Sequence, residues 1–272
     1  MTAMEAKNMA LTFCSFSSGS SGNCYLVKSG QTAILIDAGI SGRKVAESLG
    51  KAAVGAEEVK AVLITHEHSD HIRSLKAINR KLPHARTYAN SGTWESICAL
   101  VPESRRVVFK TGEEFSVGDV KIKAFPLLHD AAEPVGFSFT LGESRISILT
   151  DTGCLSEEIF DEIKEADLLI LEANHDVEML KVGRYPWFLK QRILGDRGHL
   201  SNVAAAELIC RLISGRKKNR HVLLAHLSRE NNFPEMAYQT VKNLLEEKNY
   251  YIDTNVCINI IARDEMSALY TV

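Results

Sequence analysis

The chain has 272 residues, 45% of them hydrophobic, which is enough to bury a large core. A formal net charge of −2 gives no general affinity for polyanions, so any nucleic-acid site has to be a local patch. No apolar run approaches membrane-spanning length, and the first residues lack the features of a secretory signal. Six scattered cysteines without a C-x-x-C pair are typical of reduced thiols. We expect a cytoplasmic protein without a membrane partner, folded as a single domain over residues 1–272.

Short apolar runs alternate with helical patterns along the chain. The predicted strands are 11–16, 23–28, 33–37, 62–65, 86–89, 107–108, 120–125, 136–141, 145–150, 168–172, 222–225 and 256–262. The predicted helices are 42–49, 72–81, 92–100, 157–166, 202–214 and 234–248. Ser41, Ser156 and Ser201 are expected N-caps, Gly215 is expected to close the fifth helix, and Pro234 suits a first helical turn. This order predicts an α+β fold of two sheets with helices packed outside.

The stretch LITHEHSDH at residues 63–71 contains three histidines and an aspartate within six positions. The helical zinc motif H-E-x-x-H does not fit, because Asp70 stands four residues after His66. A strand that ends at Thr65 would instead project His66 and His68 to one side, with Asp70 and His71 at the start of the next helix. The sequence therefore predicts a strand, a ligand loop and a helix. A polar loop without a metal is the alternative.

Three further candidate ligands, His129, Asp151 and His226, each follow a predicted strand. The stretches ILIDAG at 34–39 and ILTDTG at 148–153 are similar. This similarity indicates two strands that each end in an Asp at the edge of a sheet. Seven ligands are too many for one tetrahedral ion and suit two divalent metal ions that share a carboxylate. The proposed ligands of the first ion are His66, His68 and His129, those of the second are Asp70, His71 and His226, and Asp151 lies between the ions. Zn²⁺, Mn²⁺ and Fe²⁺ all fit this donor set.

The chain resembles the metallo-β-lactamase fold superfamily, and within it the YycJ (WalJ) group of single-domain metallohydrolases. The resemblance covers residues 11–260 and rests on SFSSGSSGNCYLV, THEHSDH, HDAAEPVGF, TDTG, LEANHD, GHLSN and HLSRENN. It implies a four-layer αββα sandwich with the metals at one edge of the two sheets. It also implies that Asp37 orients the histidine loop, although a plain turn role is the alternative. The group further implies 5′-to-3′ exonuclease activity, with DNA slightly favoured over RNA as the nucleic-acid substrate.

Several stretches predict contacts to a substrate phosphate or base. GHLSN places His199 just before a helix capped by Ser201 and begun by Asn202, where free N–H groups favour an anion. This element is similar to the His-Ser/Thr element of tRNase Z. His175 either lines the pocket or stabilises its own loop.

Basic and aromatic residues interleave in KVGRYPWFLKQRILGDRGH at 181–199, where Arg184 and Trp187 are candidate contacts to nucleic acid. The alternative is that the aromatic side chains fold into the core. A second basic cluster at 214–220 is expected to be a solvated helix end.

The sequence thus predicts a metallohydrolase that cleaves phosphodiesters in nucleic acid with a hydroxide activated by two metal ions. Asp70 is a ligand and candidate proton acceptor, and His199 is the candidate acid or phosphate clamp. Glu67 alternates with the ligands and is expected to point away. A thioester or lactone hydrolase of the glyoxalase II kind, or a mononuclear sulfur dioxygenase, is the alternative enzyme, because the same motif occurs there. A non-catalytic binding module is the third option.

Overall fold

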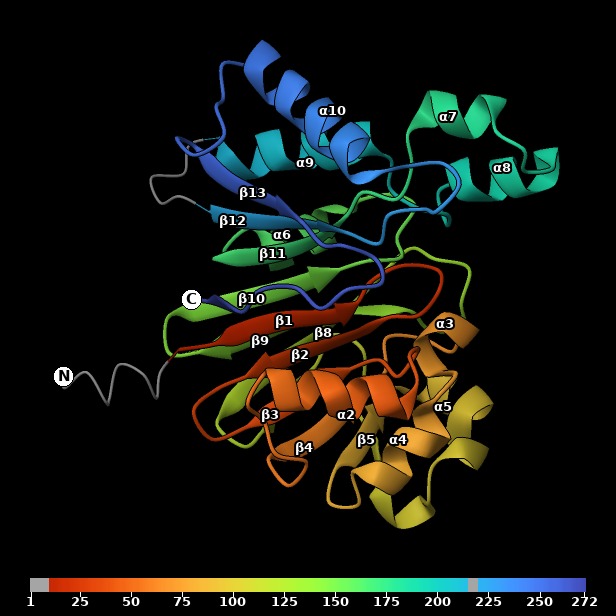
Figure 1. The fold of residues 1–272 in the computed structure, drawn as a ribbon, viewed down its shortest axis with the longest axis vertical. Coiled ribbons are helices and arrows are strands. Elements are labelled where there is room, and N and C mark those ends of the chain that lie inside the picture. Colours follow the sequence, from red (N-terminus) through yellow and green to blue (C-terminus); the bar gives the residue numbers. More distant parts are fainter. Residues whose placement is uncertain (1–9, 215–219) are drawn as a thin grey trace.

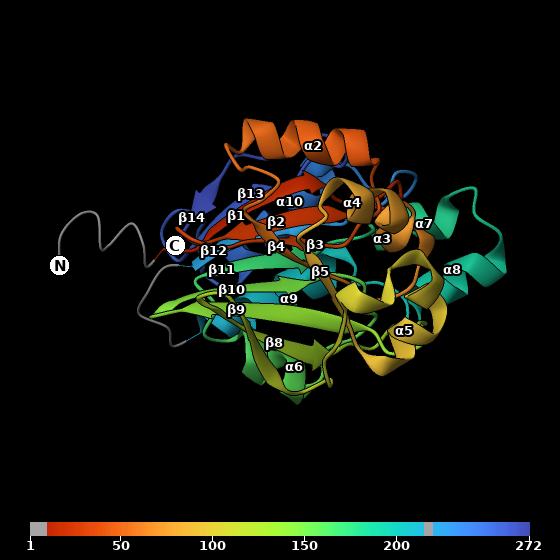
Figure 2. The ribbon, with the colours of Figure 1, turned by 90° about the horizontal axis from the view of Figure 1, so that it is seen from below.

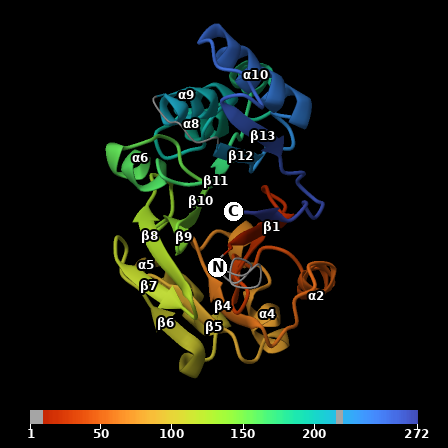
Figure 3. The ribbon, with the colours of Figure 1, turned by 90° about the vertical axis from the view of Figure 1, so that its left-hand side faces the viewer.

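The computed structural model describes residues 10–214 and 220–272. Within them, two seven-stranded sheets lie face to face and helices cover their outer sides (Figures 1 and 3). Residues 215–219 lie outside this description. They include Gly215, the predicted helix end, and most of the predicted basic cluster at 214–220.

The first sheet is built from the N-terminal half of the chain and closed by the C-terminus, in the order β14-β1-β2-β3-β4-β5-β6. Strands β3 to β6 run parallel to one another, whereas β1 and β2 are antiparallel to their neighbours. The strands are β1 (Thr12–Ser17), β2 (Cys24–Lys28), β3 (Ala33–Ile36), β4 (Val59–Leu63), β5 (Arg86–Ala89), β6 (Arg106–Val108) and β14 (Tyr270–Thr271).

The second sheet has the order β13-β12-β11-β10-β9-β8-β7. Strands β10 to β13 are parallel, and β7 to β10 form an antiparallel meander. The strands are β7 (Glu114–Val117), β8 (Val120–Pro126), β9 (Val135–Leu141), β10 (Ser144–Leu149), β11 (Leu168–Glu172), β12 (Arg220–Ala225) and β13 (Val256–Ile260). Because parallel strands end at a common edge, the carboxyl ends of β10, β11 and β12 lie side by side.

The helices pack outside the sheets, with α2 and α4 on the first and α6, α9 and α10 on the second (Figure 3). Helices α3, α7 and α8 stand at the end of the sandwich where β10 ends (Figures 1 and 2). The helices are α2 (Gly42–Lys51), α3 (Ser69–Ile72), α4 (Leu75–Lys81), α5 (Ser91–Ile97), α6 (Glu157–Ile163), α7 (Val177–Val182), α8 (Trp187–Leu194), α9 (Asn202–Ile213) and α10 (Pro234–Glu247). Two 3₁₀ turns, Cys98–Leu100 and Glu103–Arg105, follow α5.

Buried side chains alternate between two layers along the central strands. On β11, Ile170 packs between the sheets with Phe137 of β9, whereas Leu169 and Leu171 pack toward the helices. Such strands are buried on both faces, which explains why the sequence shows them as continuous apolar runs. The predicted αββα sandwich is confirmed.

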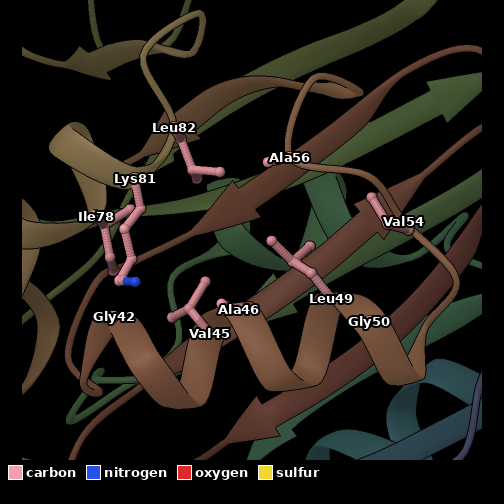
Figure 4. Close-up of a pocket in the computed structure, with 10 residues that line it drawn as sticks. All are labelled: Gly42, Val45, Ala46, Leu49, Gly50, Val54, Ala56, Ile78, Lys81 and Leu82. Atoms are coloured by element: carbon pink, nitrogen blue, oxygen red, sulfur yellow. The ribbon is translucent and has the colours of Figure 1, made fainter.

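An apolar cavity of about 260 Å³ remains between α2 and α4 (Figure 4). Val45 and Leu49 of α2 line it together with Ile78 and Leu82, and its lining is apolar apart from Lys81. It belongs to the outer layer over the first sheet and holds no histidine or carboxylate. In residues 10–214 and 220–272, no helix is both long and apolar enough to cross a membrane.

Several local predictions are confirmed and others are wrong. Ser41, Ser156 and Ser201 each accept the N-cap hydrogen bond, and Pro234 begins α10. The single helix predicted at 72–81 is wrong, because the chain breaks between α3 and α4, where the Ser74 N–H donates to the Ala38 carbonyl at 2.9 Å. Strands β7 and β14 and helices α7 and α8 were not predicted.

Candidate metal centre

Polar side chains leave the ends of neighbouring strands and converge on one point. Asp37 follows β3, Asp151 follows β10 and His226 follows β12, with backbone φ angles of 62°, 62° and 55°. These left-handed conformations are uncommon outside glycine, and Asp and His are among the residues that adopt them most readily. Strained backbone of this kind concentrates at functional sites. Asp37 and Asp151 thus occupy equivalent positions after their strands, with the same φ of 62°, as the sequence predicts.

The first group of predicted ligands comes together at the loop after β4. The ligand atoms of His66, His68 and His129 all lie within 4.8 Å of one another. His68 Nδ1 and His129 Nε2 are 3.3 Å apart, although 61 positions separate the two residues. The alternating spacing of His66 and His68 does place both rings on the same side, as the sequence predicts.

The second group lies beside the first. The ligand atoms of Asp70, His71 and His226 lie within 4.8 Å of one another, and so do those of His66, His71 and Asp151. Asp151 thus shares neighbours with both groups, and its Oδ2 lies 3.5 Å from His71 Nε2. The structure therefore brings all seven sequence-predicted ligands to one place.

The imidazoles are oriented by hydrogen bonds on their outer nitrogens. His71 Nδ1 donates to Asp37 at 2.7 Å, and His129 Nδ1 donates to the Gly198 carbonyl at 3.1 Å. His226 Nδ1 donates to Glu172 at 2.8 Å. Bonds of this kind fix the tautomer of a metal-binding histidine and leave its Nε2 without a proton, as a ligand atom has to be.

The inner atoms of the cluster lack the partners that buried polar atoms normally have. His66 Nε2, His226 Nε2 and Asp151 Oδ2 are buried and form no hydrogen bond with the described residues. Unsatisfied buried polar atoms are costly and therefore rare in folded proteins. Nitrogen and oxygen donors that face one another without protein partners fit a divalent cation, so the cluster suits divalent metal binding.

The charges within the cluster also favour a bound cation. Burial opposes protonation of His71, yet the charges of Asp37 and Asp151 raise its pKa to about 10. Burial likewise opposes the charge on His226, while Asp151 and the bond to Glu172 raise its pKa to about 9. Burial and the neighbouring His71 hold the pKa of His66 well below its usual range. The carboxylates thus favour positive charge at the centre, as a cation would supply.

Glu172, the last residue of β11, is a component of the site that the sequence analysis missed. It is fully buried, and its Oε1 accepts hydrogen bonds from His199 Nδ1 and His226 Nδ1, both at 2.8 Å. Its Oε2 accepts from the backbone N–H groups of Thr152 and Leu200, both at 3.1 Å. The available signal is a carboxylate directly after an apolar run, LLIL at 168–171, which resembles Asp37 after the apolar β3.

His199 lies at the open side of the centre. Burial lowers its pKa, but the charge of Glu172 and the hydrogen bond to it bring the pKa above the ordinary value. Its side chain remains 21% exposed. It lines a cavity of about 160 Å³ together with His129, Tyr185, Arg192 and Ser228. Because Nδ1 is held by Glu172, Nε2 is the nitrogen left for a ligand in this cavity.

The other predicted contacts lie in different places. Ser201 caps α9, and Asn202 is buried with its amide bound to Asn232, so the Asn202 side chain does not face the cavity. His175 is buried, and neither of its ring nitrogens has a partner in the described residues. Glu67 accepts from the Ala132 N–H at 2.8 Å and lies outside the groups of ligand atoms, as expected.

Arg184 and Trp187 lie on the α7–α8 hairpin, which we define as residues 177–194. Trp187 is 65% exposed, so the alternative in which the aromatic residues of this segment fold into the core is wrong for Trp187 and for its neighbour Phe188. Arg184 is also exposed.

Gly39 supports the ligand loop through a close backbone contact. A Cβ at this position would lie 1.6 Å from the Asp70 carbonyl oxygen and 2.5 Å from the Asn23 nitrogen. We expect Gly39→Ala to lower the free energy of unfolding by about 3 kcal/mol and to weaken metal binding, because the loop that carries Asp70 has to move. Urea unfolding and metal titration measure the two effects.

Gly50 of α2 provides the matched control, because a Cβ there has nothing within 4 Å. Gly50→Ala is expected to stabilise the helix by about 0.5–1 kcal/mol and to leave metal affinity unchanged. Equal metal affinity in the Gly39→Ala and Gly50→Ala variants would contradict the assigned role of Gly39.

Two buried sheets with a His/Asp cluster at their carboxyl edge define the class of metallo-β-lactamase-fold proteins. The model of the beta-lactamase superfamily domain matches residues 32–226, and the chain belongs to this superfamily. It is 40% identical over 247 residues to the exodeoxyribonuclease YycJ of Bacillus anthracis, covering 89% of this chain and 92% of that protein. It is also 40% identical to the exodeoxyribonuclease WalJ of Streptococcus pneumoniae, covering 85% and 86%.

The fold is also shared with solved structures of lower identity. The metallo-β-lactamase fold protein YhfI from Bacillus subtilis superposes with a TM-score of 0.72 at 18% identity, covering 97% of this chain and 99% of that one. The predicted superfamily, and the predicted resemblance to the YycJ (WalJ) group, are confirmed.

Proposed function

We propose that this protein is a metal-dependent phosphodiesterase that degrades DNA from its 5′ end. The observation that carries the proposal is the convergence of seven ligand residues, three of which turn buried atoms without hydrogen-bond partners into the centre, beside a cavity that His199 lines. The relatives named as exodeoxyribonucleases support DNA as the substrate and removal of nucleotides from an end. The 5′-to-3′ direction comes from the resemblance to their group.

We assign two divalent cations to the centre, Zn²⁺ or Mn²⁺ with Fe²⁺ as a further candidate, because two of the four overlapping groups of possible ligand atoms share no residue. The first is His66, His68 and His129, and the second is Asp70, His71 and His226, with Asp151 between them. Bound there, such cations supply a water nucleophile at neutral pH and neutralise charge on the phosphate. The protein's part is to hold the ligands rigidly, through Asp37 and Glu172.

In this proposal His199 acts on the leaving group. The charge of Glu172 raises its pKa and so favours the protonated ring, and the hydrogen bond from Nδ1 to Glu172 leaves Nε2 to face the cavity. The proton on Nε2 passes to the departing 3′ oxygen of the released nucleotide as the bond to phosphorus breaks. Asp70, held near Asn23, is a ligand at the exposed rim and the candidate acceptor for the proton of the attacking water.

The test replaces His199 with Ala in the metal-loaded protein. We expect turnover of 5′-labelled DNA to fall by about 100-fold with unchanged metal content, because a general acid is lost. Hydrolysis of thymidine 5′-p-nitrophenyl phosphate should fall much less, since its leaving group needs no proton. His84→Ala, which changes an exposed histidine elsewhere, is the control.

Two outcomes would overturn the proposal. Unchanged DNA turnover in the His199→Ala variant would remove the assigned acid. Hydrolysis of S-lactoylglutathione by the wild-type protein, without cleavage of DNA or RNA, would instead assign the thioester hydrolase function. Labelling the substrate at either end establishes the direction, and paired DNA and RNA substrates establish the sugar preference.

A further inference from the structure

The apolar cavity between α2 and α4 is a second hollow in the molecule, apart from the metal centre (Figure 4). It has a volume of about 260 Å³, and its floor is formed by buried hydrophobic side chains. These are Val45, Leu49, Val54, Ile78 and Leu82. No residue of the candidate metal centre lines it, so a ligand bound here would not contact the hydrolytic site.

Small residues keep the mouth of the cavity open. Ala46 and Gly50 of α2 and Ala56 of the following loop line the cavity and are exposed. A Cβ at Gly50 would have nothing within 4 Å, so close packing does not explain a glycine inside a helix, where it is less stable than alanine. The absence of larger side chains at these three positions leaves the entrance clear.

The surroundings of the mouth favour a small ligand over a protein partner. Among residues 10–214 and 220–272, no exposed large hydrophobic side chain lies on α2, on α4 or in residues 52–58 between α2 and β4. A stable protein interface covers about 800 Å² on each partner and has an apolar centre, which this cavity alone cannot supply. The apolar surface here is confined to the cavity, as in a site for a small molecule.

One unpaired cation stands at an end of the cavity. Lys81, the last residue of α4, is exposed and forms no ion pair or hydrogen bond with the described residues. Its side chain runs along the start of α2, because a Cβ on Gly42 would lie 3.1 Å from Lys81 Cδ and 3.3 Å from Cε (Figure 4). Helix α4 also carries Lys76 and Arg80 and no acidic residue, so nothing within the helix offsets the charge. An apolar cavity with a free ammonium group at its edge is complementary to an amphiphile with a negatively charged head.

The volume of the cavity sets the size of such a ligand. An apolar cavity of about 150 Å³ holds benzene, a ring of six carbons, so 260 Å³ has room for about ten non-hydrogen atoms. A carboxylate with an unbranched chain of about eight carbons has this size.

We propose that the cavity between α2 and α4 binds a small carboxylate with an apolar tail of about eight carbons, the head beside Lys81 and the tail against Val45 and Leu49. The tail provides most of the affinity, because it leaves water for an apolar lining. The head selects the sign of the charge at an exposed site, where one ion pair is weak. The site goes beyond the proposed function, since none of its residues takes part in hydrolysis.

Methyl NMR of the metal-loaded protein, titrated with octanoate, tests the proposal directly. All five hydrophobic side chains of the floor carry methyl groups, and we expect their signals to shift with a dissociation constant of about 100 μM. Leu189, which lines the cavity beside His199, should not shift, so it reports any binding of the carboxylate at the metal centre instead. Hexanoate, which lacks two methylene groups, should bind roughly 15-fold more weakly. Octylammonium should bind more weakly than octanoate, because its head repels Lys81.

Substitutions then separate the tail from the head. Ala46→Phe places a ring in the mouth and should abolish octanoate binding, while urea unfolding checks that the exposed helix position tolerates the change. Lys81→Gln should weaken octanoate binding by roughly two- to fivefold and remove the preference over octylammonium. Lys76→Gln is the matched control, because Lys76 is exposed on the same helix and does not line the cavity. It should leave both affinities unchanged.

Three results would overturn the inference. The first is the absence of shifts at the floor methyl groups up to about 5 mM octanoate, far above the expected dissociation constant. The second is a shift of Leu189 alone, which would place the carboxylate at the metal centre. The third is equal binding of octanoate by the wild-type protein and a folded Ala46→Phe variant. None of these measurements depends on cleavage of DNA, so the proposed function stands or fails separately.

Discussion

The Asp151→Asn variant is expected to lose at least roughly 10³-fold in phosphodiesterase activity, because the stabilisation that bound metal supplies is worth several kcal/mol. Asp151 is the residue that shares neighbours with both ligand groups, and its Oδ2 has no hydrogen-bond partner in the described residues. Asparagine has nearly the same shape and tolerates the φ of 62° at this position, so the substitution removes chiefly the charge. We expect elemental analysis to show two metal ions per wild-type chain and at most one in the variant.

Asp253→Asn is the matched control, because Asp253 is exposed and has a similar φ of 64°. It should keep the full metal content and activity. If the Asp151→Asn variant retained two ions per chain, the position assigned to Asp151 between two cations would be wrong, even if activity were lost.

The layers of the fold could be predicted because the central strands are buried on both faces. Residues 168–171 of β11 and 222–225 of β12 are apolar throughout, and no exposed face interrupts the signal. Helices α7 and α8 give no such signal, since they have six and eight residues and α8 turns its aromatic side chains to solvent. The break before α4 was not predictable either, because its cause is a hydrogen bond from Ser74 to the distant Ala38.

The candidate ligands could be predicted because imidazole and carboxylate groups crowded into one short loop are costly to bury unless they bind a cation. Their positions relative to one another follow from the parallel strands, whose carboxyl ends meet at one edge. Glu172 could not be found in this way. Its partners His199 and His226 lie 27 and 54 positions away, so only the folded chain shows that one carboxylate serves both rings.

Glu172→Gln is expected to lower activity at limiting metal by roughly 10³-fold, through weaker metal binding and a misoriented His199. All four groups that contact the carboxylate are donors: two imidazole N–H groups and two backbone N–H groups. A glutamine has a single acceptor oxygen, so its NH₂ group has to face two of these donors. We expect metal affinity to fall by about 10- to 100-fold and the free energy of unfolding by about 3 kcal/mol.

Glu162→Gln is the control that separates loss of metal affinity from the loss of stability that follows when any buried carboxylate is removed. Glu162 of α6 is 6% exposed. It forms ion pairs with Arg145 and, at 2.7 Å, with Lys123. This variant should also be less stable in urea, yet bind metal as the wild-type protein does. If the two variants lost stability equally and both kept full metal affinity, Glu172 would be a structural carboxylate only. A loss of metal affinity confined to the Glu172→Gln variant follows if this carboxylate sets the tautomer of His226, so that Nδ1 carries the proton and Nε2 is left to bind the cation.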